Sequence, residues 1–396
     1  HANHAVVSIR SFTKDSFFRM GEVIGIDPEM HRVFYRIAGT DTVNSMGYDH
    51  LVVSLGSVTM LPKIAGLREY GFQIKSLAHA VGLRDRAIRL LETADAIPDK
   101  EQQQAMLHWV VVGGNFTGVE VAGEFQVLLR KACRSYPNID PQDCKVTLVE
   151  IADRILPALG EDLSDYALKK LRSRKIDVRL NTTIKAIERE RVLLSSGETL
   201  SAHTTVWCAG IAPNPLIAEM PFPTDPRGYI LCDPDFRIHG FRNLWAVGDC
   251  AVNPDPQGNA YPATAQHATR QGTHLARNLL RVATGRESSP FVFNSMGSLA
   301  ALGCRTGVAK IMGIKLSGFA AWFMWRTVYL LTMPGITRKV RVAIDWALDL
   351  LFKRDFVQLG LLEEAMPRTR EAQPPQPNSF VEKKPREHAD TLKNRV

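Results

Sequence analysis

The stretch from residue 109 to residue 120 decides the fold of this chain and reads Trp109-Val110-Val111-Val112-Gly113-Gly114-Asn115-Phe116-Thr117-Gly118-Val119-Glu120. A short apolar run ends in a glycine turn, and apolar residues then recur at helical spacing. Strand, tight turn and helix in this order begin a dinucleotide-binding βαβ unit. The backbone N–H groups of the turn and the helix N-terminus together favour a bound pyrophosphate.

One position departs from the glycine pattern G-x-G-x-x-G. The three places are occupied here by Gly113, Asn115 and Gly118. The middle glycine normally lets the backbone approach the pyrophosphate, and asparagine tolerates positive φ but carries a Cβ. We therefore predict the βαβ fold, and we expect weaker binding of the pyrophosphate. The predicted binding residues are Gly113, Gly114, Asn115, Phe116, Thr117 and Gly118.

A second strand is predicted over Lys145–Glu150, and it ends in an acid. A carboxylate at this place accepts hydrogen bonds from ribose hydroxyls and repels a 2′-phosphate, which favours NADH over NADPH. Glu150 lies further along the chain than is usual, and the insert Ser135–Pro141 accounts for the extra length. The alternative is an exposed carboxylate at the end of a strand.

Composition narrows the class of protein. The net charge of +8 is spread along the chain without a long Lys/Arg run, so a nucleic-acid partner is not expected. The six cysteines form no C-x-x-C pair, which argues against a zinc site and against a redox disulfide of that type. Single cysteines of this kind suit a reducing cytoplasm. We predict no metal site.

Outside the glycine turn, the pattern predicts short strands and a few long helices. Two apolar strands end in similar turns at Gly56 and Gly210, which suggests two related nucleotide-binding domains. No glycine fingerprint precedes residue 60. Strands are predicted at 5–9, 20–27, 32–36 and 48–57, a helix at 77–94, and an antiparallel meander at 184–187, 192–194 and 198–200.

A further buried strand, Asn243–Val247, runs into Gly248-Asp249 and precedes a helical pattern over Gln266–Ala283. An aspartate at the end of such a strand can accept a hydrogen bond from a sugar or ribityl hydroxyl. The simpler interpretation is a cap of the next turn.

The C-terminal third contains two aromatic, amphipathic segments with basic flanks. Residues 319–331 are too short to span a bilayer and contain Arg326. In residues 338–354, apolar side chains share one helical face. The pattern suits an interfacial membrane anchor, and equally a helix packed on a core or in a dimer interface. From Pro367 the tail is polar and proline-rich, and we predict disorder. The apolar face predicted for the helix in residues 338–354 comprises Val340, Ile344, Ala347, Leu348 and Leu351.

Taken together, these residues resemble the type II NADH dehydrogenases, single-subunit flavoprotein NADH:quinone oxidoreductases, over nearly all of residues 1–360. The most specific segments are Val110–Glu124, Leu148–Glu150 with Arg154–Pro157, Trp245–Ala251, Ala265–Gly272 and the Trp322/Trp325/Asp345-Trp346 region.

The resemblance implies an α/β fold with two Rossmann-like domains of the pyridine nucleotide-disulfide reductase type and a C-terminal amphipathic membrane-binding region. The family's FAD-binding βαβ fingerprint would precede residue 1, so we expect an N-terminally truncated chain whose retention of FAD is open. The implied ranges are 1–105 and 236–312 for the FAD-binding domain, 106–235 for the NADH-binding domain, 313–362 for the anchoring helices and 363–396 for the tail.

The resemblance also assigns roles to single residues. Asp249 would bind the ribityl–phosphate region of FAD. The turns at Gly56, Gly210 and Gly248 are further expected cofactor-binding positions. Glu120 would lie near the nicotinamide and Glu150 on the adenosine ribose. Ala265, Gln266 and Ala268 would border the flavin ring and a quinone tunnel, although Gln266 could simply cap its helix. Arg270 stands where the family often has glutamine.

The function implied is FAD-dependent, non-proton-pumping electron transfer from NADH to a membrane quinone in a respiratory chain. The enzyme would lie on the cytoplasmic face of the cell membrane as a peripheral protein, and a homodimer is left open. Two alternatives are a soluble FAD/NAD(P)H reductase of the ferredoxin-reductase type and a non-catalytic, membrane-associated NADH-binding module.

Overall fold

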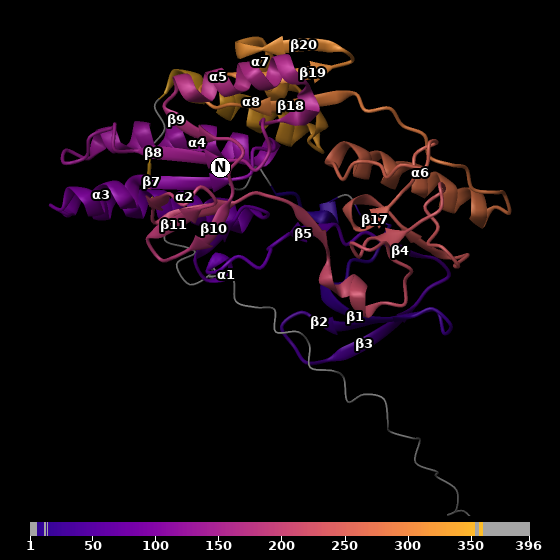
Figure 1. The fold of residues 1–396 in the computed structure, drawn as a ribbon. Helices are drawn as coiled ribbons and strands as arrows, with labels where there is room; N and C mark the ends of the chain where they lie inside the picture. Colours follow the sequence, from indigo (N-terminus) through magenta and orange to yellow (C-terminus); the bar gives the residue numbers. More distant parts are fainter. Residues whose placement is uncertain (1–5, 12, 14, 353–355, 359–396) are drawn as a thin grey trace, which may run out of the picture.

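The computed structural model describes residues 6–352, except 12 and 14, together with 356–358. Figure 1 shows two lobes, with a third layer stacked on one of them. We call the lobe around the five-stranded sheet the glycine-turn lobe. We call the other lobe, which contains Asp249 and the helix Ala265–Ala283, the Asp249 lobe. The C-terminal layer runs from Gly297 to Leu351.

The glycine-turn lobe is built on a parallel sheet with strand order β6-β13-β7-β8-β9. Its central strand β7 is fully apolar after His108, as expected of a parallel strand covered on both faces. The strands are β6 (Gly71–Gln73), β13 (Thr204–Trp207), β7 (His108–Val112), β8 (Lys145–Val149) and β9 (Ile176–Arg179). The helices are α1 (Leu67–Tyr70), α2 (Leu77–Ala96), α3 (Lys100–Leu107), α4 (Phe116–Ala132) and α5 (Glu161–Ser173).

Alternation along β7 separates two hydrophobic cores. Trp109 and Val111 belong to the core that includes the helices, whereas Val110 and Val112 pack with an antiparallel meander. That meander confirms the one predicted from sequence. Its strands are β10 (Ile184–Ile187), β11 (Arg191–Leu194) and β12 (Thr199–Ser201). The core that includes the helices and the core under the meander therefore pack on opposite faces of β7, just before the glycine turn.

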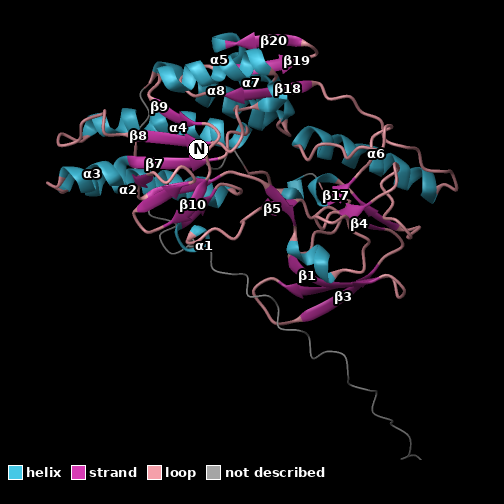
Figure 2. Cartoon of the chain, in the orientation of Figure 1, coloured by secondary structure: helices cyan, strands magenta, loops and turns pink. Residues whose placement is uncertain are grey.

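The Asp249 lobe has smaller sheets, visible in Figure 2 as short strands among loops. Two parallel pairs, β4 with β16 and β15 with β17, lie beside α6, and β1–β3 form a meander. The strand predicted at residues 5–9 is wrong: Val6–Ser8 are irregular and Ile9–Ser11 form a short 3-10 turn. The elements are β1 (Gly21–Asp27), β2 (Arg32–Ile37), β3 (Val43–Gly47), β4 (Leu51–Val53), β15 (Ile230–Leu231), β16 (Leu244–Ala246), β17 (Ala251–Val252) and α6 (Ala265–Ala283).

Two strands connect the lobes. β5 (Ser57–Thr59) pairs antiparallel with β14 (Ile211–Pro213), and Figure 1 shows β5 between the lobes. Each strand begins directly after a glycine with positive φ, Gly56 at +64° and Gly210 at +78°. The two similar glycine turns that follow strands in the sequence are therefore the points where the chain passes from one lobe to the other.

The C-terminal layer consists of an antiparallel sheet followed by two helices. Its elements are β18 (Gly297–Ala301), β19 (Gly307–Ile311), β20 (Ile314–Ser317), α7 (Gly318–Thr332) and α8 (Ile336–Leu351). Arg326 of α7 lies over the rings of Trp322 and Trp346, at 4.8 and 4.1 Å from their centroids, which fastens α8 to α7. Within the described part of the chain, no helix has both the length and the hydropathy to cross a bilayer.

This layer packs on the glycine-turn lobe (Figure 1). Arg174, at the end of α5, donates to the carbonyls of Leu302 and Gly303 at 2.5 and 2.7 Å. A Cβ at Gly123 of α4 would lie only 2.5 Å from the Leu302 oxygen, so α4 meets the β18–β19 turn at backbone distance. The predicted disordered tail, 363–396, lies outside the described residues.

Candidate functional site

The glycine turn after β7 has the close packing that a dinucleotide cradle needs. Gly113 adopts a φ of +112°, which only glycine takes without strain. A Cβ at Gly118 would overlap the carbonyl oxygen of Gly113, and one at Gly113 would come within 3.1 Å of the Ala209 nitrogen. The glycines therefore let α4 start directly against the end of the sheet.

Asn115 is the N-cap of α4. Its φ is −75°, so this position does not require a positive φ. The side chain accepts a hydrogen bond from the Gly118 amide at 2.9 Å and donates to the Cys208 carbonyl at 2.7 Å. Among the described residues, no partner is recorded for the amides of Phe116 and Thr117, which leaves them for an anion.

Glu150 lies beside this turn at the end of β8. Its Oε2 accepts a hydrogen bond from the Gly114 amide, and its Oε1 accepts one from Ala152 at 2.8 Å. The carboxylate is thus held against the glycine turn, where the ribose next to a bound pyrophosphate would lie. The residues present fit a dinucleotide with free ribose hydroxyls.

A second group of predicted residues meets in the Asp249 lobe. Gly248 has a φ of +76°, and its amide donates to Oε1 of Gln271 at 2.8 Å. A Cβ at Gly248 would touch the Cβ of Ala268 at 3.5 Å, so the strand end and the first turns of α6 adjoin. The positive φ is what requires glycine here, and it leaves the backbone next to Asp249 without a side chain, which fits a cofactor chain lying along the backbone.

Asp249 has partners that the sequence did not reveal. Ser57 of β5 donates from Oγ to Asp249 Oδ2 at 3.2 Å, and Lys75 donates from Nζ to Ser57 Oγ at 3.0 Å. These hydrogen bonds run from the Asp249 lobe through the connecting strand β5 to Lys75, two residues before α2. No local pattern marks Ser57 or Lys75, because the three residues are far apart in the sequence.

The first turns of α6 are tied to the segment leading to β18. Gln266 donates from Nε2 to Ser295 Oγ at 2.9 Å and to the Gly297 carbonyl at 3.2 Å. Arg270 lies over the ring of Phe293, at 4.5 Å from its centroid, and no ion pair to a described carboxylate is recorded for it. Burial lowers the pKa of the neighbouring His267, and Arg270 lowers it further.

Glu120 does not stand alone on α4. Its Oε1 accepts hydrogen bonds from the Ala301 amide of β18 and from Trp325 Nε1 of α7, both at 3.0 Å. Burial raises the pKa of Glu120, and the two hydrogen bonds partly oppose that rise. Sequence reasoning identified Glu120 but missed both partners, which follow it by 181 and 205 positions.

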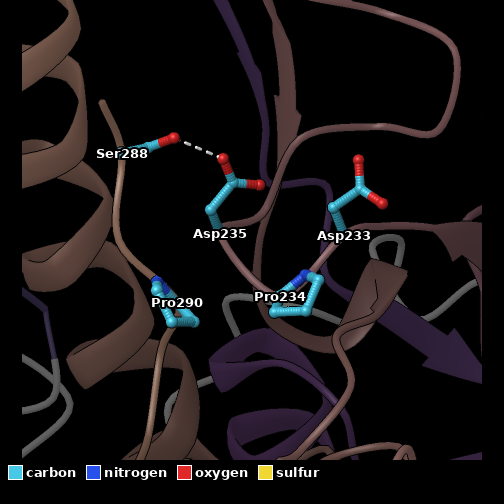
Figure 3. A pocket seen from close by; sticks show the side chains of 5 residues that line it. All are labelled: Asp233, Pro234, Asp235, Ser288 and Pro290. Carbon is cyan, nitrogen blue, oxygen red and sulfur yellow. Dashed lines mark hydrogen bonds between the residues drawn. The ribbon is translucent and has the colours of Figure 1, made fainter. Parts of the chain in front are cut away.

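A shallow pocket elsewhere in the Asp249 lobe contains none of the predicted residues (Figure 3). Its walls are Asp233, Pro234, Asp235, Ser288 and Pro290, and Ser288 Oγ donates to Asp235 Oδ2 at 2.5 Å. The same oxygen accepts from Arg237 at 2.8 Å, so this carboxylate is already satisfied. In the described ranges, no group of three or more His, Cys, Asp or Glu side chains could hold a metal ion.

Comparison with known proteins identifies the family to which this chain belongs. The model of the pyridine nucleotide-disulphide oxidoreductase family matches residues 2–272, and that of the NDH2 C-terminal domain matches residues 296–355. A probable NADH dehydrogenase of Dictyostelium discoideum is 31% identical over 339 residues, covering 84% of this chain and 74% of the relative. The chain belongs to the type II NADH dehydrogenase family.

Other type II relatives agree with this assignment. The type II NADH:quinone oxidoreductase of Staphylococcus aureus is 33% identical over 287 residues, covering 71% of this chain and 70% of the relative. The structure of NDH2 from Plasmodium falciparum in complex with NADH has the same fold, with a TM-score of 0.83, 20% identity and coverage of 90% and 89%. Type II NADH dehydrogenases are FAD-dependent NADH:quinone oxidoreductases, and the C-terminal match decides against the soluble-reductase alternative.

Proposed function

We propose that the glycine-turn lobe binds NADH and the Asp249 lobe binds FAD, so that this type II NADH dehydrogenase passes electrons from NADH to a membrane quinone. The observation that carries the proposal is the glycine turn, where an acid and two amides without a partner among the described residues lie at one helix N-terminus. Bound FAD supplies the hydride acceptor and the electron donor for the quinone. The protein supplies binding, orientation and charge.

On the NADH side, the amides of Phe116 and Thr117 bind the pyrophosphate at the positive end of α4. Glu150 binds the ribose hydroxyls through carboxylate lone pairs that its two backbone contacts leave open. A 2′-phosphate would meet this negative charge, which is the physical reason for preferring NADH. Glu120, one turn into the helix, borders the nicotinamide end.

On the FAD side, the Asp249 carboxylate accepts a hydrogen bond from a ribityl hydroxyl, and Gly56 and Gly248 leave room for the cofactor. The N-terminus of the 19-residue helix α6 stabilises negative charge near Ala265 and Ala268. Gln266 borders the quinone: its Nε2 donates to Ser295 and Gly297, which sets its orientation, and its Oε1 is left to accept a hydrogen bond from a quinol hydroxyl.

The outer face of α7 and α8 anchors the protein to the cytoplasmic side of the membrane. The predicted apolar face of α8 is exposed: Ile344 is 54% exposed, whereas Val342 on the opposite face is 2% exposed. An exposed apolar stripe is what interfacial insertion requires, and a helix packed on a core would bury it. The exposed side chains are Phe319, Phe323, Leu331, Ile336, Val340, Ile344, Leu348 and Leu351. A homodimer stays a prediction.

The visible spectrum of the purified chain tests the activity. We expect a flavin band that NADH bleaches under anaerobic conditions and that added quinone restores. A colourless protein, or a flavin that NADH does not reduce, would contradict the proposed function.

Flotation with liposomes tests the anchor. We expect deletion of residues 313–396 to release the protein from the vesicles, because the deletion removes the whole exposed apolar face. Deletion of residues 359–396 alone is the matched control and should leave binding unchanged. If the shorter protein still floats with the vesicles, α7 and α8 are not the anchor.

A further inference from the structure

One contact between the C-terminal layer and α4 of the glycine-turn lobe is made by the carboxylate of Glu120. Glu120 lies four residues after the start of α4, or about 6 Å along the helix axis from its first residue. Both donors to its Oε1, the Ala301 amide and Trp325 Nε1, come from the C-terminal layer. Among the described residues, no hydrogen-bond partner is recorded for Oε2.

We propose that Trp325 is a positioning residue for Glu120: its indole holds Oε1, fixes the carboxylate plane and leaves Oε2 as the oxygen that a ligand meets. The inference rests on the proposed function, in which Glu120 borders the nicotinamide end of NADH. In this arrangement the membrane-facing layer supplies part of the active site, beyond its role as an anchor.

The packing around the carboxylate makes the contact specific. Gly123, three residues after Glu120, lets α4 approach the β18–β19 turn at backbone distance, which brings the Ala301 amide within reach. Arg174 binds the same turn through Leu302, Gly303 and Thr306. On the other side, the ring of Trp325 packs on that of Tyr329 at a centroid distance of 4.7 Å, which limits rotation of the indole.

The charges around Glu120 explain why an indole donor matters there. Burial and the negative charge of Glu124 on α4 both raise the pKa of Glu120, and no cation contributes to lowering it. Tyr329 on α7 also has a raised pKa, through burial and the charge of Glu120. The hydrogen bonds from Ala301 and Trp325 are therefore the contacts that favour the ionised carboxylate. Removing the indole N–H should make Glu120 easier to protonate.

The test is a pH titration of the whole 396-residue chain, followed by NMR of ¹³C-labelled glutamate carboxyl groups, with Glu120→Gln used to assign the signal. In Trp325→Phe, which keeps an aromatic ring but loses the donor, we expect the Glu120 midpoint to rise by about half to one pH unit. Trp322→Phe, a change on the same helix that contacts Arg326 and not Glu120, is the matched control and should leave the midpoint unchanged.

An unchanged Glu120 midpoint in Trp325→Phe, or an equal shift in Trp322→Phe, would overturn the inference. A second measurement avoids any folding defect of the variant: in the wild-type chain, the indole N–H resonance of Trp325 should follow the titration of Glu120, and in Glu120→Gln it should not. Failure of the proposed function is seen separately, because the protein would then lack a flavin band that NADH bleaches, whatever the titrations show.

Discussion

The two nucleotide sites of this enzyme are assembled in different ways. In the glycine-turn lobe, the predicted binding residues come from two adjacent strands and the start of one helix, between Gly113 and Glu150. In the Asp249 lobe, residues at Ser57, Asp249 and Gln271 meet only through long-range contacts; Ser57 and Asp249 are 192 positions apart. A local site tolerates changes elsewhere in the molecule, whereas a dispersed site depends on how the lobes pack.

The largest expected effect is that of Gly118→Ala, which should break the local site alone. The new Cβ would overlap the Gly113 carbonyl, so the turn must move. We expect at least about 100-fold weaker NADH binding and a loss of about 3 kcal/mol in the free energy of unfolding, because overpacking against backbone cannot relax cheaply. Isothermal titration with NADH and thermal unfolding measure the two effects, and the flavin content should not change.

Gly272→Ala is the matched control for that variant. Gly272 lies in α6, and a Cβ added there would have nothing within 4 Å, so alanine should be neutral or stabilise the helix by about 0.5–1 kcal/mol. If Gly118→Ala bound NADH as tightly as Gly272→Ala, the close packing of the turn would not matter for binding.

A smaller effect is expected from Glu150→Ala. Loss of the carboxylate removes its bonds to the Gly114 amide and to the ribose, so the KM for NADH should rise about tenfold, or about 1.4 kcal/mol. The flavin spectrum should be unaltered, since the dispersed site does not include this residue. Glu198→Ala removes a half-exposed carboxylate of the same lobe and should leave KM unchanged. An unchanged KM in Glu150→Ala would remove the ribose assignment.

The smallest expected effect concerns pH and the stability of the glycine-turn lobe. Burial lowers the pKa of His108, whose ring contacts the Ser201 carbonyl at 2.9 Å and Thr147 Oγ1 at 2.8 Å. A histidine kept neutral in the folded state gives stability that is complete above its ordinary pKa, near 6.5. That stability is lost as the pH falls below this value, because only the unfolded chain then gains the proton.

Thermal unfolding between pH 8 and pH 5 checks this expectation. His108→Asn should weaken the fall in stability toward acid pH. A variant whose stability falls in parallel with that of the wild type would show that His108 is not among the responsible groups.

Predictions from sequence succeeded where the signal was local. The helix predicted at 77–94 is α2, and the strands of the meander lie within one residue of the predicted bounds. The exposed apolar face of α8 is the one that the helical spacing indicated. The strand predicted at residues 5–9 was wrong, since a short apolar run carries little information about whether a neighbouring strand exists to pair with it.

The predicted site residues show the same difference between local patterns, which the sequence reveals, and long-range contacts, which it does not. The motif alone presents Asn115 as a weak glycine substitute. Its capping bond to Gly118 is local, but its bond to Cys208 spans 93 positions and required the tertiary structure. Glu120 is assigned through the family resemblance, and its bond to Trp325 depends on the C-terminal layer folding back onto α4. No local sequence pattern around Glu120 or Trp325 predicts this contact, because the two residues are 205 positions apart.

The sequence by itself determined the strand, the glycine turn, the helix and the acid at Glu150, because these follow from the spacing of neighbouring residues and from the φ angles that glycine alone adopts freely. Only the tertiary structure decided which distant groups complete each site. Ser57, itself bound by Lys75, donates a hydrogen bond to Asp249, and Trp325 donates one to Glu120. Hydrogen bonds between remote segments form only after the lobes and the C-terminal layer have packed, and no local pattern encodes that packing.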